Sequence, residues 1–291
     1  MIKNIKAKTL LSSKKEGIDD YFGIRYTMNL YRGCQFGCIY CDSRSACYGI
    51  ENFSDVLIKE NALELLEKEL RSKRKKGTIG TGSMNDPYMP VEKKTELTRG
   101  ALKLIKKYRF PLHVITKGGL VVRDTDLLKE ISKVYAAVSF TITASDDKLA
   151  KQIEPHAPSS SKRFEAIKKL SGEGIYTGIV LTPILPFITD TKENIEEIVV
   201  KAKEAGAGYI LCWFGMTIRE GQREYFYNEL DKRFPGLKES YIKRYRYNYS
   251  CPVPLHDELY KMFNNLCRKG NIETRMKFYK DSKPEQISLF N

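Results

Sequence analysis

The chain has 291 residues, with 50 lysines and arginines against 36 aspartates and glutamates, which gives a formal net charge of +14 at pH 7. No apolar run reaches the roughly 18 residues of a membrane-spanning helix, and the basic N-terminus lacks a signal-peptide pattern, so we expect a cytoplasmic protein with no membrane partner. The odd count of seven cysteines, three of them clustered, favours a reducing compartment over a disulfide framework.

The positive charge attracts polyanions and raises the association rate with nucleic acid. Part of it lies in runs such as residues 71–76, Arg-Ser-Lys-Arg-Lys-Lys, which are also typical of a solvated helix face. From charge alone, a nucleic-acid partner and a merely solvated surface are both open.

The most informative pattern is C-x3-C-x2-C, formed by Cys34, Cys38 and Cys41. A zinc site normally has four ligands, and a 4Fe-4S cluster with four protein thiolates has no iron free for a substrate. Three thiolates leave one iron open. The amino and carboxylate groups of S-adenosylmethionine can chelate that iron. One electron from the cluster can then cleave the sulfonium to a 5′-deoxyadenosyl radical. The alternative is a zinc ion with a fourth ligand from elsewhere, for which the candidates are Cys47, His113 and Cys251.

Beyond the cysteine loop, apolar segments of strand length alternate with amphipathic helical patterns. Strands are predicted at residues 26–31, 78–82, 112–116, 136–142, 176–182 and 209–214. Helices are predicted near residues 60–75, 95–108, 124–133, 161–171, 191–205 and 219–233. Strand–helix units with right-handed crossovers build a parallel, barrel-like sheet, so we predict an α/β fold. We expect a core barrel with an N-terminal lead-in over residues 1–235, and a helical C-terminal extension with a flexible tail over residues 236–291.

In such a sheet, ligands collect at the carboxyl ends of the strands. The second predicted strand ends in a glycine-rich turn, residues 80–88, which presents Ser83, Asn85 and Asp86. Glycines let the backbone approach a ligand closely, and Asn and Asp side chains can accept hydrogen bonds from the ammonium of a bound methionine moiety. A plain turn is the alternative, because Asn-Asp-Pro favours turns by itself.

Two further polar residues belong to the next strands. Lys117 follows the third strand, where its ammonium can pair with the carboxylate of the methionine moiety, and Ser139 on the fourth strand can donate to the same group. Each has an ordinary explanation, since a lone lysine is usually a solvated charge and a lone strand serine a satisfied core hydroxyl. Their convergence on one rim favours the cofactor role.

Residues 241–252 interleave tyrosines with lysine and arginine, as expected of a surface that stacks bases and neutralises phosphates. An amphipathic segment that closes the open side of the barrel with buried tyrosine rings explains the pattern equally well. Thiol and tyrosine groups both relay radicals, so we predict Cys251 as a hydrogen-atom donor, with Tyr249 as its catalytic neighbour. An inert cysteine is the alternative.

The last residues form a polar linker with a short apolar end. The pentapeptide from Gln286 to Phe290 resembles the segment by which bacterial repair proteins and polymerases dock to the DNA sliding clamp. In that case Leu289 and Phe290 would fill an apolar pocket of the clamp while the tail becomes ordered. The alternative is that the Leu-Phe pair packs onto the chain's own barrel.

The cysteine motif, with the aromatic Tyr40 before its third cysteine, is followed by the Ser-Met-Asn-Asp-Pro turn, a Thr-Lys pair and a Ser-Phe-Thr strand. Across roughly residues 25 to 215, this series resembles the spore photoproduct lyase-like branch of the radical-SAM superfamily. The resemblance implies a partial (β/α)6 TIM-like barrel with the loop for a 4Fe-4S cluster after its first strand, and S-adenosyl-L-methionine as cofactor. We also expect a reductant such as flavodoxin or ferredoxin. By resemblance, the S-adenosylmethionine contacts would come from Asn85, Asp86, Lys117 and Ser139, with Tyr40 and the stretch from Val180 to Leu185 bordering adenine.

The chain departs from that branch in the turn after the second strand. In photoproduct lyases this turn carries a cysteine that returns a hydrogen atom to the product radical, whereas Ser83 and Met84 stand here. The O–H bond of serine is too strong to replace a thiol in that step, so we do not expect the photoproduct-lyase reaction itself. We predict a radical-SAM enzyme that abstracts hydrogen from a nucleic acid, with DNA favoured, in repair or modification. The alternatives are a radical-SAM enzyme acting on a peptide or small metabolite, and a non-catalytic, metal-stabilised nucleic-acid-binding protein.

Overall fold

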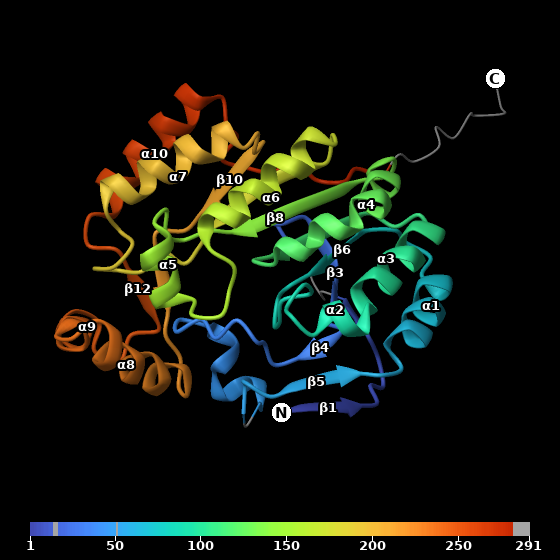
Figure 1. Ribbon diagram of the computed structural model, residues 1–291, viewed down its shortest axis with the longest axis horizontal. Helices are drawn as coiled ribbons and strands as arrows, with labels where there is room; N and C mark the ends of the chain where they lie inside the picture. The colour runs from blue at the N-terminus through green and yellow to red at the C-terminus, as the bar shows by residue number, and fades with distance from the viewer. Residues whose placement is uncertain (14–16, 51, 282–291) are drawn as a thin grey trace, which may run out of the picture.

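The computed structural model describes residues 1–13, 17–50 and 52–281, and its main feature is a seven-stranded sheet with the order β10-β9-β8-β7-β6-β3-β2 (Figure 1). The strands are β2 (Leu11–Ser13), β3 (Ile24–Met28), β6 (Thr78–Thr81), β7 (Leu112–Thr116), β8 (Ala136–Thr141), β9 (Tyr176–Leu181) and β10 (Tyr209–Cys212). Within this sheet, β3, β6, β7, β8, β9 and β10 pair in parallel, and β2 adds an antiparallel edge. In the described part of the chain the two outermost strands do not pair with each other, so the sheet is open. The predicted α/β fold with a partial barrel is confirmed.

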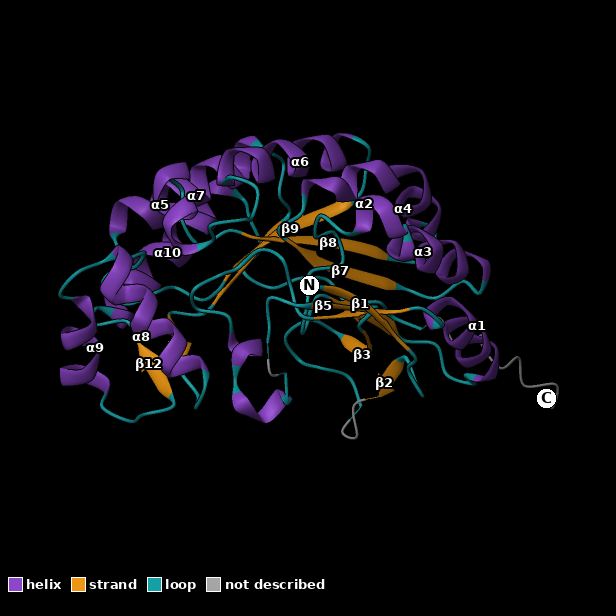
Figure 2. Cartoon of the chain, turned by 60° about the horizontal axis from the view of Figure 1, so that its bottom comes forward, coloured by secondary structure: helices purple, strands orange, loops and turns teal. Residues whose placement is uncertain are grey.

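Helices that follow the parallel strands form an arc along one side of this sheet (Figure 2). They are α1 (Ala62–Ser72), α3 (Leu97–Lys107), α4 (Thr125–Ser132), α6 (Ser160–Gly172) and α7 (Lys192–Glu204), with the short α2 (Glu92–Thr95) and α5 (Asp147–Ile153). Each long helix buries one apolar face, as α1 does with Leu66 and Leu70. Side-chain caps define several helix starts, because Asp146, Ser159 and Thr191 each accept a hydrogen bond from the N–H three residues later.

A second, smaller sheet holds the chain just before the cysteine loop. Its order is β1-β5-β4, with the strands β1 (Ile2–Ile5), β5 (Val56–Lys59) and β4 (Tyr31–Arg32). The prediction of one strand over residues 26–31 is therefore wrong, because the chain leaves the main sheet after β3 and enters the small sheet as β4. Short 3-10 helices follow the cysteine loop and β7, at Asp42–Arg44, Ala46–Tyr48 and Gly119–Asp124.

The C-terminal part packs beside the β10 end of the main sheet. Its elements are β11 (Gly215–Thr217), α8 (Gln222–Arg233), α9 (Leu237–Tyr245), β12 (Ser250–Pro252) and α10 (His256–Gly270), and β11 pairs antiparallel with β12. Tyr241 and Tyr245 on α9 are buried, whereas Tyr247 is 92% exposed and Tyr249 is 51% exposed. The first half of the tyrosine-rich segment is therefore core, and only its second half offers aromatic rings to solvent.

After α10 the chain runs along the outer side of β10. The N–H of Ile210 donates to the carbonyl of Glu273 at 2.8 Å, and the N–H of Glu273 donates to the carbonyl of Gly208 at 3.1 Å. The N–H of Lys277 then donates to the hydroxyl of Tyr176 at 3.0 Å. The pentapeptide from Gln286 to Phe290 lies outside the described residues. Within the described residues, no helix is both long and apolar enough to span a membrane.

Candidate active site at the strand ends

A cavity lies at the carboxyl ends of the parallel strands, where ligands collect in this type of sheet. One wall is the cysteine loop, and the others are positions at or just past successive strands. These positions include Asp86 after β6, Lys117 after β7, Thr141 on β8, Thr182 after β9 and Trp213 after β10. Segments far apart in the sequence therefore contribute polar groups to one space.

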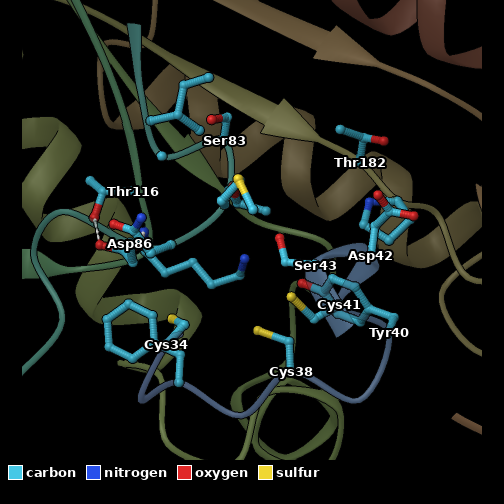
Figure 3. A pocket seen from close by; sticks show the side chains of 18 of the residues that line it. Cys34, Cys38, Tyr40, Cys41, Asp42, Ser43, Ser83, Asp86, Thr116 and Thr182 are labelled. Carbon is cyan, nitrogen blue, oxygen red and sulfur yellow. Dashed lines mark hydrogen bonds between the residues drawn. The ribbon is translucent and has the colours of Figure 1, made fainter. Parts of the chain in front are cut away.

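All three cysteines of the motif line this cavity, and Figure 3 shows the sulfur atoms of Cys34, Cys38 and Cys41 facing the same space. Burial raises the pKa of each thiol, to about 12 for Cys34. The free thiols are therefore protonated at neutral pH, and each must lose a proton when it binds a metal.

The arrangement of these thiols fits a cluster better than a single zinc ion. Among the residues that the structure describes, no three histidine, cysteine, aspartate or glutamate side chains converge closely enough to bind one metal ion. Sulfurs bound to one zinc at about 2.3 Å lie within roughly 4 Å of one another, whereas each thiolate of a 4Fe-4S cluster binds a different iron. The residues considered as a fourth zinc ligand, which do not line the cavity, are Cys47, His113 and Cys251.

Glycines set the path of the cysteine loop. Gly33 and Gly37 have φ angles of +76° and +67°, in the left-handed region that favours glycine. A β-carbon on Gly33 would overlap the backbone oxygen of Asp55. The next residue, Cys34, donates its N–H to the carbonyl of Phe53 at 3.2 Å. The position of the three thiols therefore depends on the close approach of the backbone at Gly33 to the backbone of Asp55.

The other side of the cysteine loop docks on the segment after α5. The N–H of Ile39 donates to the carbonyl of Ile153 at 3.0 Å, and the N–H of His156 donates to the carbonyl of Phe36 at 3.1 Å. These backbone hydrogen bonds hold the loop against the end of α5, and the hydroxyl of Tyr40 adds a side-chain hydrogen bond to Glu154.

Asp86 joins the ends of β6 and β7. Its carboxylate accepts hydrogen bonds from Oγ1 of Thr116 at 2.6 Å, drawn in Figure 3, and from the N–H of Lys117 at 2.7 Å. The neighbouring Asn85 donates from Nδ2 to the carbonyl of Tyr31 at 2.8 Å. Both side chains therefore shape the turn and also line the cavity.

Lys117 carries its positive charge into the cavity. Its Nζ lies 3.8 Å from Oε1 of Glu154 and 5.6 Å from the ring centroid of Tyr40. Burial lowers the pKa of Lys117, but the charge of Cys38 in its deprotonated form and the charge of the Glu154 carboxylate outweigh burial, so that its pKa is raised overall. The ammonium is thus held in its charged form, the form that pairs with a carboxylate.

The structure brings together only part of the predicted cofactor site. The predicted residues that line the cavity are Tyr40, Ser83, Asn85, Asp86 and Lys117. Ser139, Val180 and Leu185 are buried and do not line the cavity. The Ser139 hydroxyl instead hydrogen-bonds to Nε2 of His113 at 2.7 Å and to the hydroxyl of Tyr209 at 2.6 Å. From the stretch predicted to border adenine, the residues in the cavity wall are Thr182 and Pro183. The cofactor roles stay predictions.

The residues predicted as catalytic lie beside the cavity rather than in its wall. Cys251 is buried on β12, directly opposite Met216 of β11, which does line the cavity. The half-exposed Tyr249 accepts a hydrogen bond from Nη2 of Arg219 at 2.8 Å, and the same guanidinium lies 5.0 Å from its ring centroid. Their catalytic roles stay predictions as well.

Sequence reasoning missed Trp213 in the wall of the cavity and Glu154 directly behind that wall. Trp213, the only tryptophan of the chain, lines the cavity and is 39% exposed. Its place at the end of a predicted strand is a signal that could have identified it. Glu154 follows α5, a helix that was not predicted, and no spacing in the sequence marks it as a partner of Tyr40 or Lys117.

Comparison with known proteins assigns the chain to a protein family. The family model of the Radical SAM superfamily matches residues 28–202, more than half of the chain. An uncharacterized protein of Methanocaldococcus jannaschii is 39% identical over 178 residues, which are 60% of this chain and 66% of that protein. A Radical SAM Nalpha-GlyT isomerase of Pseudomonas phage M6 is 23% identical over 181 residues, 62% of this chain and 37% of that protein. The chain thus spans less than two thirds of either relative.

Solved structures show the same fold. Spore photoproduct lyase complexed with dinucleoside spore photoproduct superposes with a TM-score of 0.66 at 16% identity, covering 92% of this chain and 79% of that one. Since the family match includes the cysteine motif and every strand from β6 to β9, the chain belongs to the radical-SAM superfamily of enzymes and has a fold like that of spore photoproduct lyase.

Proposed function

We propose that this enzyme reductively cleaves S-adenosylmethionine at a 4Fe-4S cluster held by Cys34, Cys38 and Cys41, and abstracts a hydrogen atom from a nucleic acid, with DNA favoured. The observation that carries the proposal is the convergence of three thiols, one buried and two partly buried, and the Lys117 ammonium on one cavity at the strand ends. The cluster and its bound cofactor would supply the 5′-deoxyadenosyl radical.

The chain's own residues would bind and orient the cofactor. Lys117 offers a charge-assisted pair to the methionine carboxylate. Ser83, Asn85 and Asp86 face the same space from the turn after β6, and the Asp86 carboxylate has lone pairs beyond those its own hydrogen bonds occupy. Tyr40 closes the wall next to the third cysteine.

The side chains at the rim of the cavity favour a planar, anionic substrate. Trp213 offers a partly exposed ring on which a base can stack. Arg219 pairs with Asp42 of the cavity wall at 3.3 Å and with the ring of Tyr249, and so places a cation at the same rim. Together with the net charge of +14, stacking rings beside a cation favour a nucleic acid.

The reaction would differ from photoproduct reversal. Ser83 and Met84 stand in the turn that lines the cavity, and neither side chain has a thiol to return a hydrogen atom. We therefore assign that step to Cys251 or Tyr249, which lie behind the side of the cavity formed by β11. Spore photoproduct lyase has been solved with a dinucleoside photoproduct, which supports a nucleic-acid substrate for this chain.

Replacing a cysteine of the loop tests the cluster. Anaerobic reconstitution of the wild type should give about four irons per chain and cleavage of S-adenosylmethionine to 5′-deoxyadenosine after reduction. Cys38→Ala should abolish that cleavage, whereas Cys267→Ala, a buried cysteine on α10, should retain it. Full cleavage by Cys38→Ala would refute the assignment, and one zinc per chain without iron would indicate a metal-stabilised binding protein instead.

The substrate is tested with deuterated oligonucleotides. The reconstituted, reduced enzyme is incubated with each oligonucleotide, and mass spectrometry measures deuterium in the 5′-deoxyadenosine produced. Transfer of deuterium is expected from a nucleic-acid substrate. Cleavage without transfer from any oligonucleotide would point to a peptide or a small metabolite.

A further inference from the structure

A buried pair of opposite charges lies directly behind the cysteine loop. Glu154, at the end of α5, and Arg163, on α6, are each 1% exposed, and their side chains form an ion pair. Removing two full charges from water is costly, and a buried ion pair is often no more stabilising than apolar side chains of the same shape. A contribution to stability is therefore a weak explanation for this pair.

Arg163 is anchored by the backbone. Its Nη1 donates to the carbonyl of Thr141 at 2.9 Å, while Nε and Nη2 donate to the carbonyl of Pro158 at 2.9 Å and 2.6 Å. With its donors engaged in this way, the guanidinium has a fixed position. From this position the guanidinium forms an ion pair with Oε2 of Glu154.

The other carboxylate oxygen faces two residues that line the cavity. Oε1 of Glu154 accepts a hydrogen bond from the hydroxyl of Tyr40 and lies 3.8 Å from Nζ of Lys117. The two oxygens of Glu154 therefore have separate partners, Arg163 on the side of α6 and the cavity residues on the other side.

The charges of this group do not cancel. Lys117 and Arg163 contribute two positive charges, and Glu154 contributes one negative charge. The separation of 3.8 Å is too long for an N–H···O hydrogen bond, so Glu154 restrains the ammonium electrostatically without occupying its three donors. Those donors stay available for an anion in the cavity.

We propose that Glu154 and Arg163 are positioning residues, in which Arg163 fixes Glu154 and Glu154 orients the Lys117 ammonium toward the carboxylate of S-adenosylmethionine. The inference rests on the proposed function, because it assigns a ligand to Lys117. A purely structural role for Glu154 is the competing explanation. Backbone hydrogen bonds from Ile39 and His156 already hold the loop on the end of α5.

A double-mutant cycle separates the two explanations. Glu154→Gln and Lys117→Met are made singly and together, and each protein is loaded with its cluster anaerobically. Iron and sulfide per chain are counted, and affinity for S-adenosylmethionine is measured by equilibrium dialysis with the cluster oxidised, so that no cleavage occurs. We expect Glu154→Gln to weaken binding by about tenfold when Lys117 is present, and by less than about twofold when residue 117 is Met.

The chain offers a matched control in Glu92. Glu92 is also buried, accepts a hydrogen bond from the hydroxyl of Tyr31 at 2.6 Å and pairs with Arg123 at 2.8 Å, but neither of these partners lines the cavity. Glu92→Gln should lower the melting temperature and leave the affinity for S-adenosylmethionine unchanged.

Glu154→Gln leaves Arg163 buried without its partner, so this variant can fail to fold. The pair Glu154→Gln with Arg163→Met removes both charges and is carried through the same cycle. An equal loss of affinity with lysine or methionine at residue 117, or no loss at all in a protein with full iron content, would overturn the inference. If the wild type with a full cluster fails to bind S-adenosylmethionine, the proposed function falls, and the inference with it.

Discussion

His113 and Ser139 meet inside the sheet, on adjacent strands. The imidazole Nε2 lies 2.7 Å from the serine hydroxyl, and the ring lies 5.6 Å from the ring centroid of Phe22. Burial lowers the pKa of His113 to about 4, so the imidazole is neutral in the folded protein at any pH above that value.

This histidine makes the fold sensitive to acid. Between about pH 6.5 and pH 4 the unfolded chain binds a proton at His113 that the folded chain does not, so stability falls as the pH falls through this window. This shift in the pKa of His113 lowers the free energy of unfolding by roughly 3 kcal/mol once the pH is below about 4. We expect His113→Gln to flatten the dependence of the free energy of unfolding on pH between 7 and 4.5, measured by urea unfolding.

The exposed His256 supplies the control for that experiment. His256→Gln makes the same substitution on a side chain that is 49% exposed, so the free energy of unfolding at pH 7 should stay close to that of the wild type. Identical slopes for wild type and His113→Gln would show that the buried imidazole is not the group responsible.

Some residues of the site could be predicted from the sequence because their signals are local. Three closely spaced cysteines and a lysine directly after a strand need no knowledge of the tertiary structure. Glu154 could not be predicted, since its bond to Tyr40 joins residues 114 positions apart. Ser139 has the same strand context as a rim residue, and only the register with β7 and β10 shows that its hydroxyl is satisfied within the sheet.

At the scale of elements, the cysteine loop depends on the close approach of two backbones at Gly33. Gly33→Ala should displace the loop, because its methyl group would overlap the carbonyl of Asp55 in addition to the strain of a positive φ. We expect iron and sulfide content after reconstitution to fall well below that of the wild type.

Gly174 has the same φ of +76°, and a β-carbon there meets nothing within 4 Å. Gly174→Ala therefore carries the backbone strain alone, about 1 kcal/mol, and should keep its iron. If both variants retain full iron content, the contact with Asp55 does not control the loop.

The parallel strands of the main sheet were predictable and the strands of the small sheet were not. Strand β7, Leu112–Thr116, has the predicted bounds, because its apolar run is flanked by clear breaks. Strands β1, β4 and β5 have four residues or fewer and pair only through long-range contacts, so no local period marks them. The residues before the cysteine loop were consequently assigned to the wrong sheet.

At the scale of the whole molecule, the net charge of +14 favours binding to polyanions that weakens with salt. Affinity for a single-stranded oligonucleotide should fall linearly in a log–log plot against salt concentration. Arg219→Ala should lower the slope by about 1, since it removes a cation from the cavity rim. Fluorescence anisotropy at several salt concentrations measures both quantities.

Lys133, at the end of α4 on the outer helical layer, is the control for Arg219. Lys133→Ala should leave the slope unchanged, because this lysine pairs with Glu130 away from the cavity. A slope near zero for the wild type would argue against nucleic acid and for one of the other substrate classes.

The overall architecture followed from repeated local signals, since each strand–helix unit carries its own apolar period. The C-terminal segments that pack around the open sheet could not be predicted from such local signals. The buried rings of Tyr241 and Tyr245, which both lie against Phe187, and the segment after α10 are placed by contacts with residues far away in the chain.

The segment around Glu273 has a consequence for self-association. An outer strand with free N–H and C=O groups can template the addition of a strand from another molecule, which is a common route to aggregation. The backbone of Glu273 hydrogen-bonds to the C=O of Gly208 and to the N–H of Ile210 beside β10. A closed barrel would have its next strand at this place. Loss of the segment after α10 by proteolysis would therefore expose the edge of β10 and favour self-association along that strand, even with every residue of the cavity intact.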